Sequence, residues 1–223
     1  MGGDSDTAPG TPAVAVMDWR LRTFELYAAV RAKAGADGPA ASHALWVRGR
    51  DAMFATHPAS ALGAQEKARF TGLPVAAYDP AFRFECRLSP EGAGEEMLVR
   101  TGTDGTVPFE RLGTFHVPGA GSLAAWLLRG YGGGIFVPFR DAGSGRPGGS
   151  YGAGRYLLDT IKGAFLGQAG GTFTLDFNFA YNPSCAYDEA WACPLPGPAN
   201  RLPAAIPVGE LYRPELGGHP AGP

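Results

Sequence analysis

The chain has few charged residues and no excess of positive charge. Charged residues make up 18% of the sequence, and 19 Lys and Arg against 21 Asp and Glu leave a formal net charge of −2. Proteins that bind nucleic acids or anionic membrane surfaces present clustered Lys and Arg. We therefore expect no nucleic-acid partner and no membrane partner.

Long apolar runs and a secretory leader are also missing. No window approaches the ~18 consecutive apolar residues of a membrane-spanning helix. The first residues include Asp4 and Asp6 and only a short apolar run at 13–16, whereas a secretory signal has a basic start and an apolar centre. We therefore expect a cytoplasmic protein with mostly reduced cysteines.

Motifs for phosphates and metals are scarce. GxxxxGK[ST] does not occur, and no GxGxxG opens a predicted helix. Of the three cysteines, Cys185 and Cys193 are eight positions apart, wider than the CxxC of most zinc sites. A zinc or iron site would need His57 or His116 in addition. Cys185 and Cys193 are thus weak metal candidates, and no cofactor is implied.

Glycine and proline are abundant, with 34 and 20 residues, together about 24% of the chain. Hydrophobic residues at 45% and aromatic residues at 11% nevertheless provide material for a packed core. Glycine and proline therefore separate short structural elements in a globular protein.

The N-terminal part shows helical periodicity. Residues 18–33 place Trp19, Tyr27 and Val30 on one face, and residues 42–55 predict a second amphipathic helix, followed by a short turn at 64–70. The residues expected to cap or end these helices are Asp18, Gly35, Ser42 and Pro58.

After Gly72 the spacing of the hydrophobic residues changes from a helical period to every second position. Phe82, Phe84, Cys86 and Leu88 alternate with charged residues, which is typical of a half-buried strand at 81–88. Further strands are predicted at 96–101, 107–117, 123–128, 135–141, 155–160, 172–181 and 204–211.

These elements predict one mainly β domain of the α+β class over residues 18–212. About eight short strands in succession indicate an antiparallel β-barrel or curved β-sandwich, with the N-terminal helical segment packed against it. The Gly- and Pro-rich ends, 1–17 and 213–223, are expected to be poorly ordered tails.

Several motifs resemble the bacterial and archaeal family catalogued as domain of unknown function 1684. The resemblance covers roughly residues 19–210, with a Gly-rich insertion, RPGGS, before Tyr151. Its motifs include FVPFRD…YGAGRYL, LDFNFAYNPSCAY, CPLPGPANRLP and VGE, with RDAMFATHPAS and FTGLPVAAYDPAFRF upstream. The resemblance implies a shared fold and a shared site but supplies no activity.

Polar residues of these motifs cluster on two predicted strands and the loops that follow them. Alternation in strand 172–181 places Asp176 and Asn178 on one face. The backbone N–H groups of a glycine-rich loop can approach an anion closely, and the Arg155 guanidinium can bind a carboxylate or phosphate. The predicted ligand-binding residues are Arg140, Tyr151, Arg155, Tyr156, Asp176, Asn178, Tyr181 and Asn182. Alternatively, this is a structural hairpin in which Arg155 pairs with Asp141 or Asp176.

As a binding residue, Arg155 or Asn178 would be replaceable by alanine with little loss of thermal stability. The sequence does not decide which residues are catalytic, because it cannot show that a nucleophile lies close to a base. The candidates are Asp176, Glu210, Cys185 and His57.

The sequence therefore predicts a protein that binds a small polar or anionic molecule beside the loop 151–156 and the strand end 176–182. A hydrolase or isomerase using the same pocket is one alternative. A structural or partner-binding protein without a ligand is the other. Whether the protein is an enzyme, and its oligomeric state, are left open.

Overall fold

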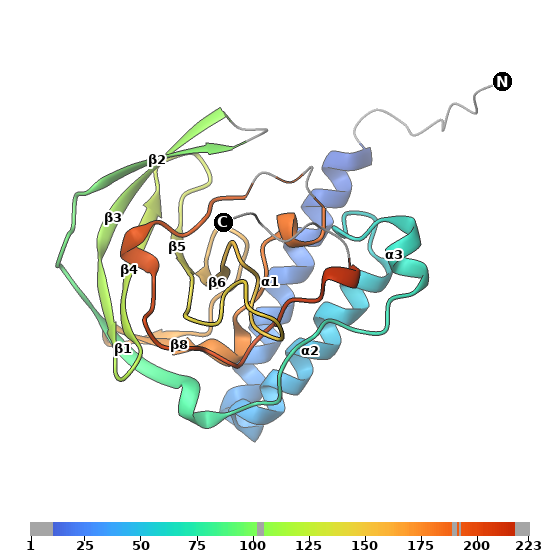
Figure 1. Ribbon diagram of the computed structural model, residues 1–223, viewed down its shortest axis with the longest axis horizontal. Coiled ribbons are helices and arrows are strands. Elements are labelled where there is room, and N and C mark those ends of the chain that lie inside the picture. The colour runs from blue at the N-terminus through green and yellow to red at the C-terminus, as the bar shows by residue number, and fades with distance from the viewer. Residues whose placement is uncertain (1–10, 102–104, 189–190, 192, 217–223) are drawn as a thin grey trace.

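Two long helices form the N-terminal part of the computed structural model, which describes residues 11–101, 105–188, 191 and 193–216. Helix α1 (Thr11–Asp37) and helix α2 (Pro39–Thr56) pack side by side, and a short helix α3 (Ala64–Ala68) follows (Figure 1). Gly38, with φ of +87°, joins them.

Both helices were predicted, but their ends were not. Helix α1 begins at Thr11, inside the predicted tail, and Asp18 lies within it. Asp18 binds Arg22 and His57 and caps nothing. Ser42 likewise lies inside α2, where its hydroxyl donates to the carbonyl of Pro39. Helix-compatible Ala, Val and Met residues extend α1 toward the N-terminus. Residues 1–10 and 217–223 of the predicted tails lie outside the described residues.

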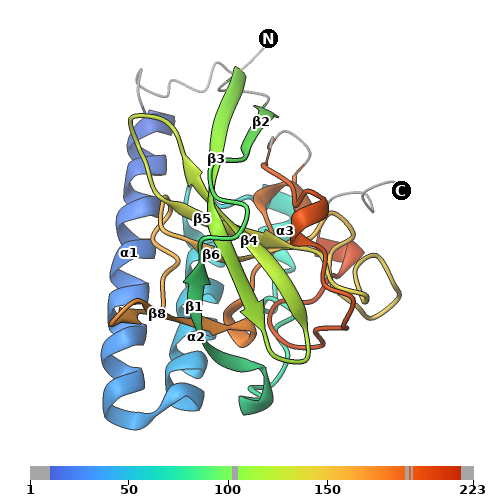
Figure 2. The ribbon, with the colours of Figure 1, turned by 90° about the vertical axis from the view of Figure 1, so that its left-hand side faces the viewer.

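A single antiparallel sheet forms the rest of the fold, in the order β6-β5-β4-β3-β1-β8-β7, with β2 paired to β3. It curls into a half-barrel, and α1 and α2 lie across its open side (Figures 1 and 2). The strands are β1 (Arg83–Ser89), β2 (Glu96–Thr101), β3 (Gly105–Val117), β4 (Gly121–Leu128), β5 (Ile135–Phe139), β6 (Arg155–Asp159), β7 (Gln168–Ala169) and β8 (Thr172–Asp176). The predicted fold class is confirmed, with one curled sheet in place of a closed barrel or two sheets.

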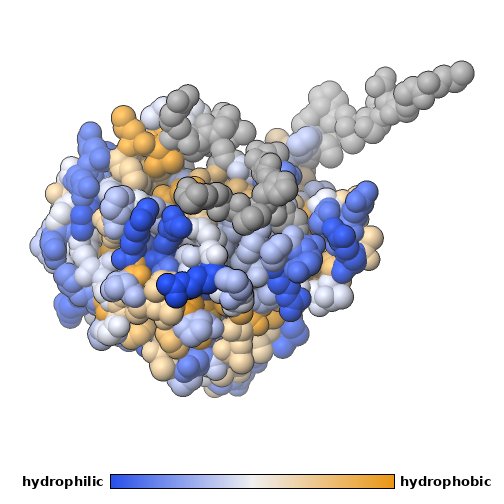
Figure 3. Space-filling view, viewed as in Figure 1, coloured by the Kyte–Doolittle hydropathy of each residue, from blue (hydrophilic) through white to orange (hydrophobic). Residues whose placement is uncertain are grey.

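The main core fills the concave side of this sheet. Phe115, Leu123, Phe139, Leu175 and Phe177 are each no more than 1% exposed and belong to one cluster. The surface of the molecule seen in Figure 3, in contrast, mixes hydrophilic and hydrophobic side chains. A second cluster joins the helices to the segment after β8, with Tyr27, Val30 and Trp46 against Phe179. Burial of these side chains fixes both helices on the sheet.

Two predicted strands are wrong in part or entirely. Strand β8 ends at Asp176, because this carboxylate accepts the backbone N–H of Asn178 and starts a short 3-10 helix at Phe177–Phe179. Residues 204–211 form no strand, although Glu210 makes an isolated bridge to Val75. Within the described residues, no helix is long and apolar enough to cross a membrane.

Candidate functional site

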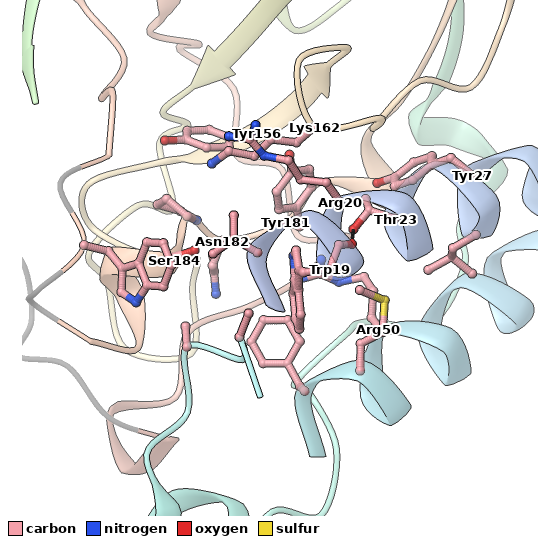
Figure 4. A pocket seen from close by; sticks show the side chains of 18 residues that line it. Trp19, Arg20, Thr23, Tyr27, Arg50, Tyr156, Lys162, Tyr181, Asn182 and Ser184 are labelled. Atoms are coloured by element: carbon pink, nitrogen blue, oxygen red, sulfur yellow. Dashed lines mark hydrogen bonds between the residues drawn. The ribbon is translucent and has the colours of Figure 1, made fainter. Parts of the chain in front are cut away.

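A cavity of about 120 Å³ opens between α1, α2 and the segment that follows β8. Its walls are largely aromatic, and three cationic side chains face it (Figure 4). The residues used below are Trp19, Arg20, Tyr27, Arg50, Phe54, Tyr156, Lys162, Tyr181, Asn182 and Trp191. No Asp or Glu lines it among the described residues.

Arg50 lines this cavity and is largely buried. Its guanidinium lies 5.0–5.1 Å from the ring centres of Trp46, Phe54 and Tyr181. Arg50 Nη2 also donates to Glu210 Oε2 at 2.6 Å, while Nε has no partner among the described residues. A largely buried cation held by one carboxylate and three rings keeps its attraction for a second anion.

Glu210 lies behind Arg50 and is fully buried. Burial raises the pKa of Glu210 above its ordinary value, although Arg50 opposes the shift. Its carboxylate also accepts the backbone N–H of Asn182 at 3.2 Å. Glu210 thus orients Arg50 and Asn182 and does not itself line the cavity.

Asn182 presents an unpaired amide oxygen. Its Nδ2 donates to the Leu211 carbonyl at 2.9 Å, but Oδ1 is buried without a partner among the described residues. An unpaired buried acceptor costs about 1–3 kcal/mol. Asn182 lines the cavity, although Oδ1 itself has almost no accessible surface.

Two further cations line the cavity. Arg20 comes from α1 and Lys162 from the turn after β6, and Figure 4 shows both on the side of Tyr156. Neither forms an ion pair with any described residue. Glu210 pairs with Arg50, and the buried Asp159 interacts electrostatically with Lys162, so the three cations at the cavity are only partly offset.

Tyr156 and Tyr181 provide rigid walls. Their rings lie edge to face, with centroids 5.6 Å apart. The Tyr156 hydroxyl donates to the Pro194 carbonyl and that of Tyr181 to Asp159. Burial holds the pKa of both phenols well above the ordinary value, so both stay neutral.

Arg155, in contrast, lies away from the cavity. It is fully buried, and its Nη2 binds Asp141 at 2.9 Å and the Ile206 carbonyl at 2.8 Å. Its Nη1 donates to the carbonyls of Val208 and Glu210. Alternate carbonyls of an extended segment point to one side, so one guanidinium satisfies all three. This explains why 204–211 needs no neighbouring strand, and it confirms the Arg155–Asp141 pairing.

Asp176 and Asn178 also bind the protein itself. The Asn178 amide pairs with both the N–H and the carbonyl of Asp79, and its Nδ2 donates to Asp176. Asp176 accepts from Tyr78 and lies 3.4 Å from Arg83. Burial raises the pKa of Asp176, which the contacts with Asn178 and Arg83 oppose. Both side chains are fully buried and hold the segment that precedes β1.

The other predicted ligand-binding residues divide between the cavity and its surroundings. Tyr156, Tyr181 and Asn182 line it, whereas Tyr151 and Arg140 do not. The Tyr151 hydroxyl donates to the Cys185 carbonyl, and the Arg140 backbone pairs with Asn200 and Leu202.

None of the four catalytic candidates lines the cavity. His57 Nε2 contacts Asp18 at 2.9 Å, and its Nδ1 accepts the N–H of Ala59, so the ring joins α1 to the end of α2. Glu210 and Asp176 are fully buried as described above. The Glu210 carboxylate forms its ion pair with Arg50.

Cys185, the fourth candidate, lies beside Cys193. A hydrogen bond between the two thiols raises the pKa of Cys185 and lowers that of Cys193. Both are free thiols, and no group of three metal-ligating side chains exists among the described residues.

A serine motif also proves structural. Residues 148–152 read GGSYG and fit the GxSxG pattern of serine hydrolases. The Ser150 hydroxyl, however, donates to Asp141 at 2.8 Å and is buried beside Ser144. No strand-to-helix turn presents Ser150 to solvent.

Comparison with protein families assigns the chain. The family model "Protein of unknown function (DUF1684)" matches residues 68–211. The chain belongs to the DUF1684 family. An uncharacterized protein of Haloarcula marismortui, solved in solution by NMR, shares 32% identity with a TM-score of 0.51, covering 74% of this chain and 89% of that one. Nothing among the curated proteins matches.

The residues matched by the DUF1684 model form only part of the cavity wall. Tyr156, Lys162, Tyr181 and Asn182 lie within the matched residues, whereas α1 and α2 precede them. Arg20, Arg50 and Lys162 were not predicted as site residues. The upstream family motif RDAMFATHPAS begins with Arg50, and it was the one signal in the sequence that pointed to Arg50.

Proposed function

We propose that the protein binds a small anionic molecule with an apolar, single-ring-sized body in the cavity between α1, α2 and the segment after β8. The observation that carries the proposal is the combination of Arg50, desolvated among aromatic rings, with Arg20 and Lys162, neither of which forms an ion pair among the described residues.

Size and shape support this ligand class. A dry cavity of about 150 Å³ holds a benzene molecule, and the cavity here is of similar volume, about 120 Å³. Trp19, Phe54 and Tyr156 provide apolar walls, and Arg20, Arg50 and Lys162 line the same cavity. A carboxylate or phosphate on a compact ring would use both the apolar walls and the cations.

Binding fits the geometry better than hydrolysis or isomerisation. The predicted catalytic groups are occupied by protein contacts outside the cavity. The phenols of Tyr156 and Tyr181 donate to other acceptors and stay neutral.

The test uses benzoate and phenyl phosphate as anionic probes and benzyl alcohol as their neutral counterpart. Proton–nitrogen NMR spectra of the full chain report binding through the indole N–H signals of Trp19 and Trp191, which line the cavity. We expect at least one anion to shift these signals and benzyl alcohol to bind more weakly.

Lys162→Gln should weaken binding of that anion about tenfold, equivalent to about 1.4 kcal/mol. Arg48→Gln is the matched control, because Arg48 is exposed on the same helix as Arg50 and has no partner among the described residues. Equal affinity for benzyl alcohol and the anions, or no binding of any probe, would contradict the proposal.

A further inference from the structure

An apolar stripe runs along the outer face of α1. Val14, Met17, Leu21 and Phe24 are 60%, 53%, 52% and 48% exposed. Their spacing of three, four and three residues places them on one face of a helix, and Ala28 occupies the next position of the pattern. The opposite face of α1 packs Val30 into the protein.

The stripe is about half exposed along the helix, and at its end Phe24 also packs against Gly163 of the turn after β6, where an added Cβ would lie 2.9 Å from Phe24 Cγ. Figure 2 shows α1 at the outside of the molecule, with α2 and the sheet on its other side. The stripe ends at Arg31, whose guanidinium donates to the Phe165 carbonyl at 2.7 Å. Four large apolar side chains in the a and d positions of two successive heptads are typical of a helix that packs against another helix.

We propose that two copies of the chain pair in parallel through this α1 stripe. The argument for a second copy is charge complementarity. Arg20 and Glu25 flank the stripe on opposite sides, at g and e positions, and neither has an ion pair among the described residues. In a parallel pair, a g side chain faces the e side chain five residues later on the other helix. Arg20, which is exposed and also lines the cavity, then meets Glu25 of the other copy.

The same charges decide against an antiparallel pair. There, g positions face g positions and e positions face e positions, which would bring arginine to arginine and glutamate to glutamate. A membrane surface fits less well, because helices that lie on membranes carry mainly Lys and Arg beside the apolar face. Here Asp18 and Glu25 lie on one side of the stripe.

Sedimentation velocity of the full chain over a range of concentrations tests the pairing. We expect a reversible species of twice the chain mass of 23.2 kDa. Leu21→Glu should give a monomer with an unchanged circular dichroism spectrum, because Leu21 is exposed. Ala29→Glu is the control, since Ala29 is exposed on α1 beside the stripe and should leave the dimer intact.

A charge exchange tests the orientation. Arg20→Glu and Glu25→Arg should each weaken dimerisation about fivefold, and the combined variant should recover the affinity of the original chain. A monomer at every concentration, a dimer that survives Leu21→Glu, or a combined variant without recovery would overturn the proposal. Sedimentation with phosphatidylcholine vesicles that Leu21→Glu abolishes would also overturn it, in favour of a membrane.

Discussion

In this fold, single polar side chains form hydrogen bonds with backbone groups that a neighbouring strand would otherwise form. Asn200 donates to the carbonyls of Ala124 and Pro138 and accepts the indole N–H of Trp126. Arg155 and Asn178 act in the same way on other segments. The polar residues of the family motifs therefore hold irregular chain segments on the sheet, and a buried group of this kind is costly to remove.

Replacement of Arg155 should consequently destabilise the protein, contrary to the expectation from sequence. Arg155→Met leaves Asp141 charged and buried and three carbonyls unpaired, so we expect a loss of about 3–5 kcal/mol in urea unfolding. Arg87→Met, at an exposed position of β1, is the control.

The double variant Arg155→Met with Asp141→Leu should recover part of the loss, because it also removes the unpaired charge. A change of less than about 1 kcal/mol in Arg155→Met would refute this structural role.

His43 should make stability depend on pH. Burial lowers the pKa of His43 below its ordinary value of 6.5, although its hydrogen bond to the Asn178 carbonyl opposes the shift. The unfolded chain then binds a proton that the folded chain does not. This contribution is complete above pH 6.5 and is lost as the pH falls toward the folded pKa.

Urea unfolding at about pH 7.5 and 5.5 measures this effect, in a window that follows from the ordinary pKa of histidine. We expect the original chain to lose more stability than His43→Gln between these conditions, since glutamine can keep the hydrogen bond but does not titrate. Equal losses would show that His43 is not the responsible group.

At the scale of elements, two glycines near the end of α1 have different roles. Gly35 was predicted to lie past the helix but lies inside it, whereas Gly38 has a φ of +87° between α1 and α2. An added Cβ would meet nothing within 4 Å at either position. Backbone conformation alone therefore distinguishes them.

Gly35→Ala should stabilise the protein by about 0.5–1 kcal/mol, because alanine favours the helix. Gly38→Ala should destabilise it by about 1–3 kcal/mol, because its backbone conformation is open almost only to glycine. Thermal unfolding of the two variants side by side tests the contrast, and shifts of the same sign would contradict it.

Local patterns were sufficient for most elements but not for all. Alternation at 81–88 predicted β1, and helical spacing at 18–33 predicted most of α1. At 204–211 the same kind of pattern was misleading, because the partner of that segment is the side chain of Arg155 and not a strand. Periodicity reports which face is buried and says nothing of what satisfies the backbone.

At the scale of the whole molecule, the cavity depends on contacts between distant parts of the chain. Arg20, Arg50 and Lys162 lie on three elements, and none belongs to a motif with a known chemistry. Sequence could predict Tyr156, Tyr181 and Asn182 because the first two lie in predicted strands and the third follows one. The three cations could not be predicted as neighbours, because only the packing of α1 and α2 across the open side of the sheet brings them together.

One wall of the cavity thus comes from helices that precede the matched family residues, and the other from within them. Mutations confined to α1 could alter ligand preference without disturbing the folding of the sheet. Selection could then act on recognition and on the scaffold separately. A common scaffold with independently evolving helices would let related proteins recognise different molecules.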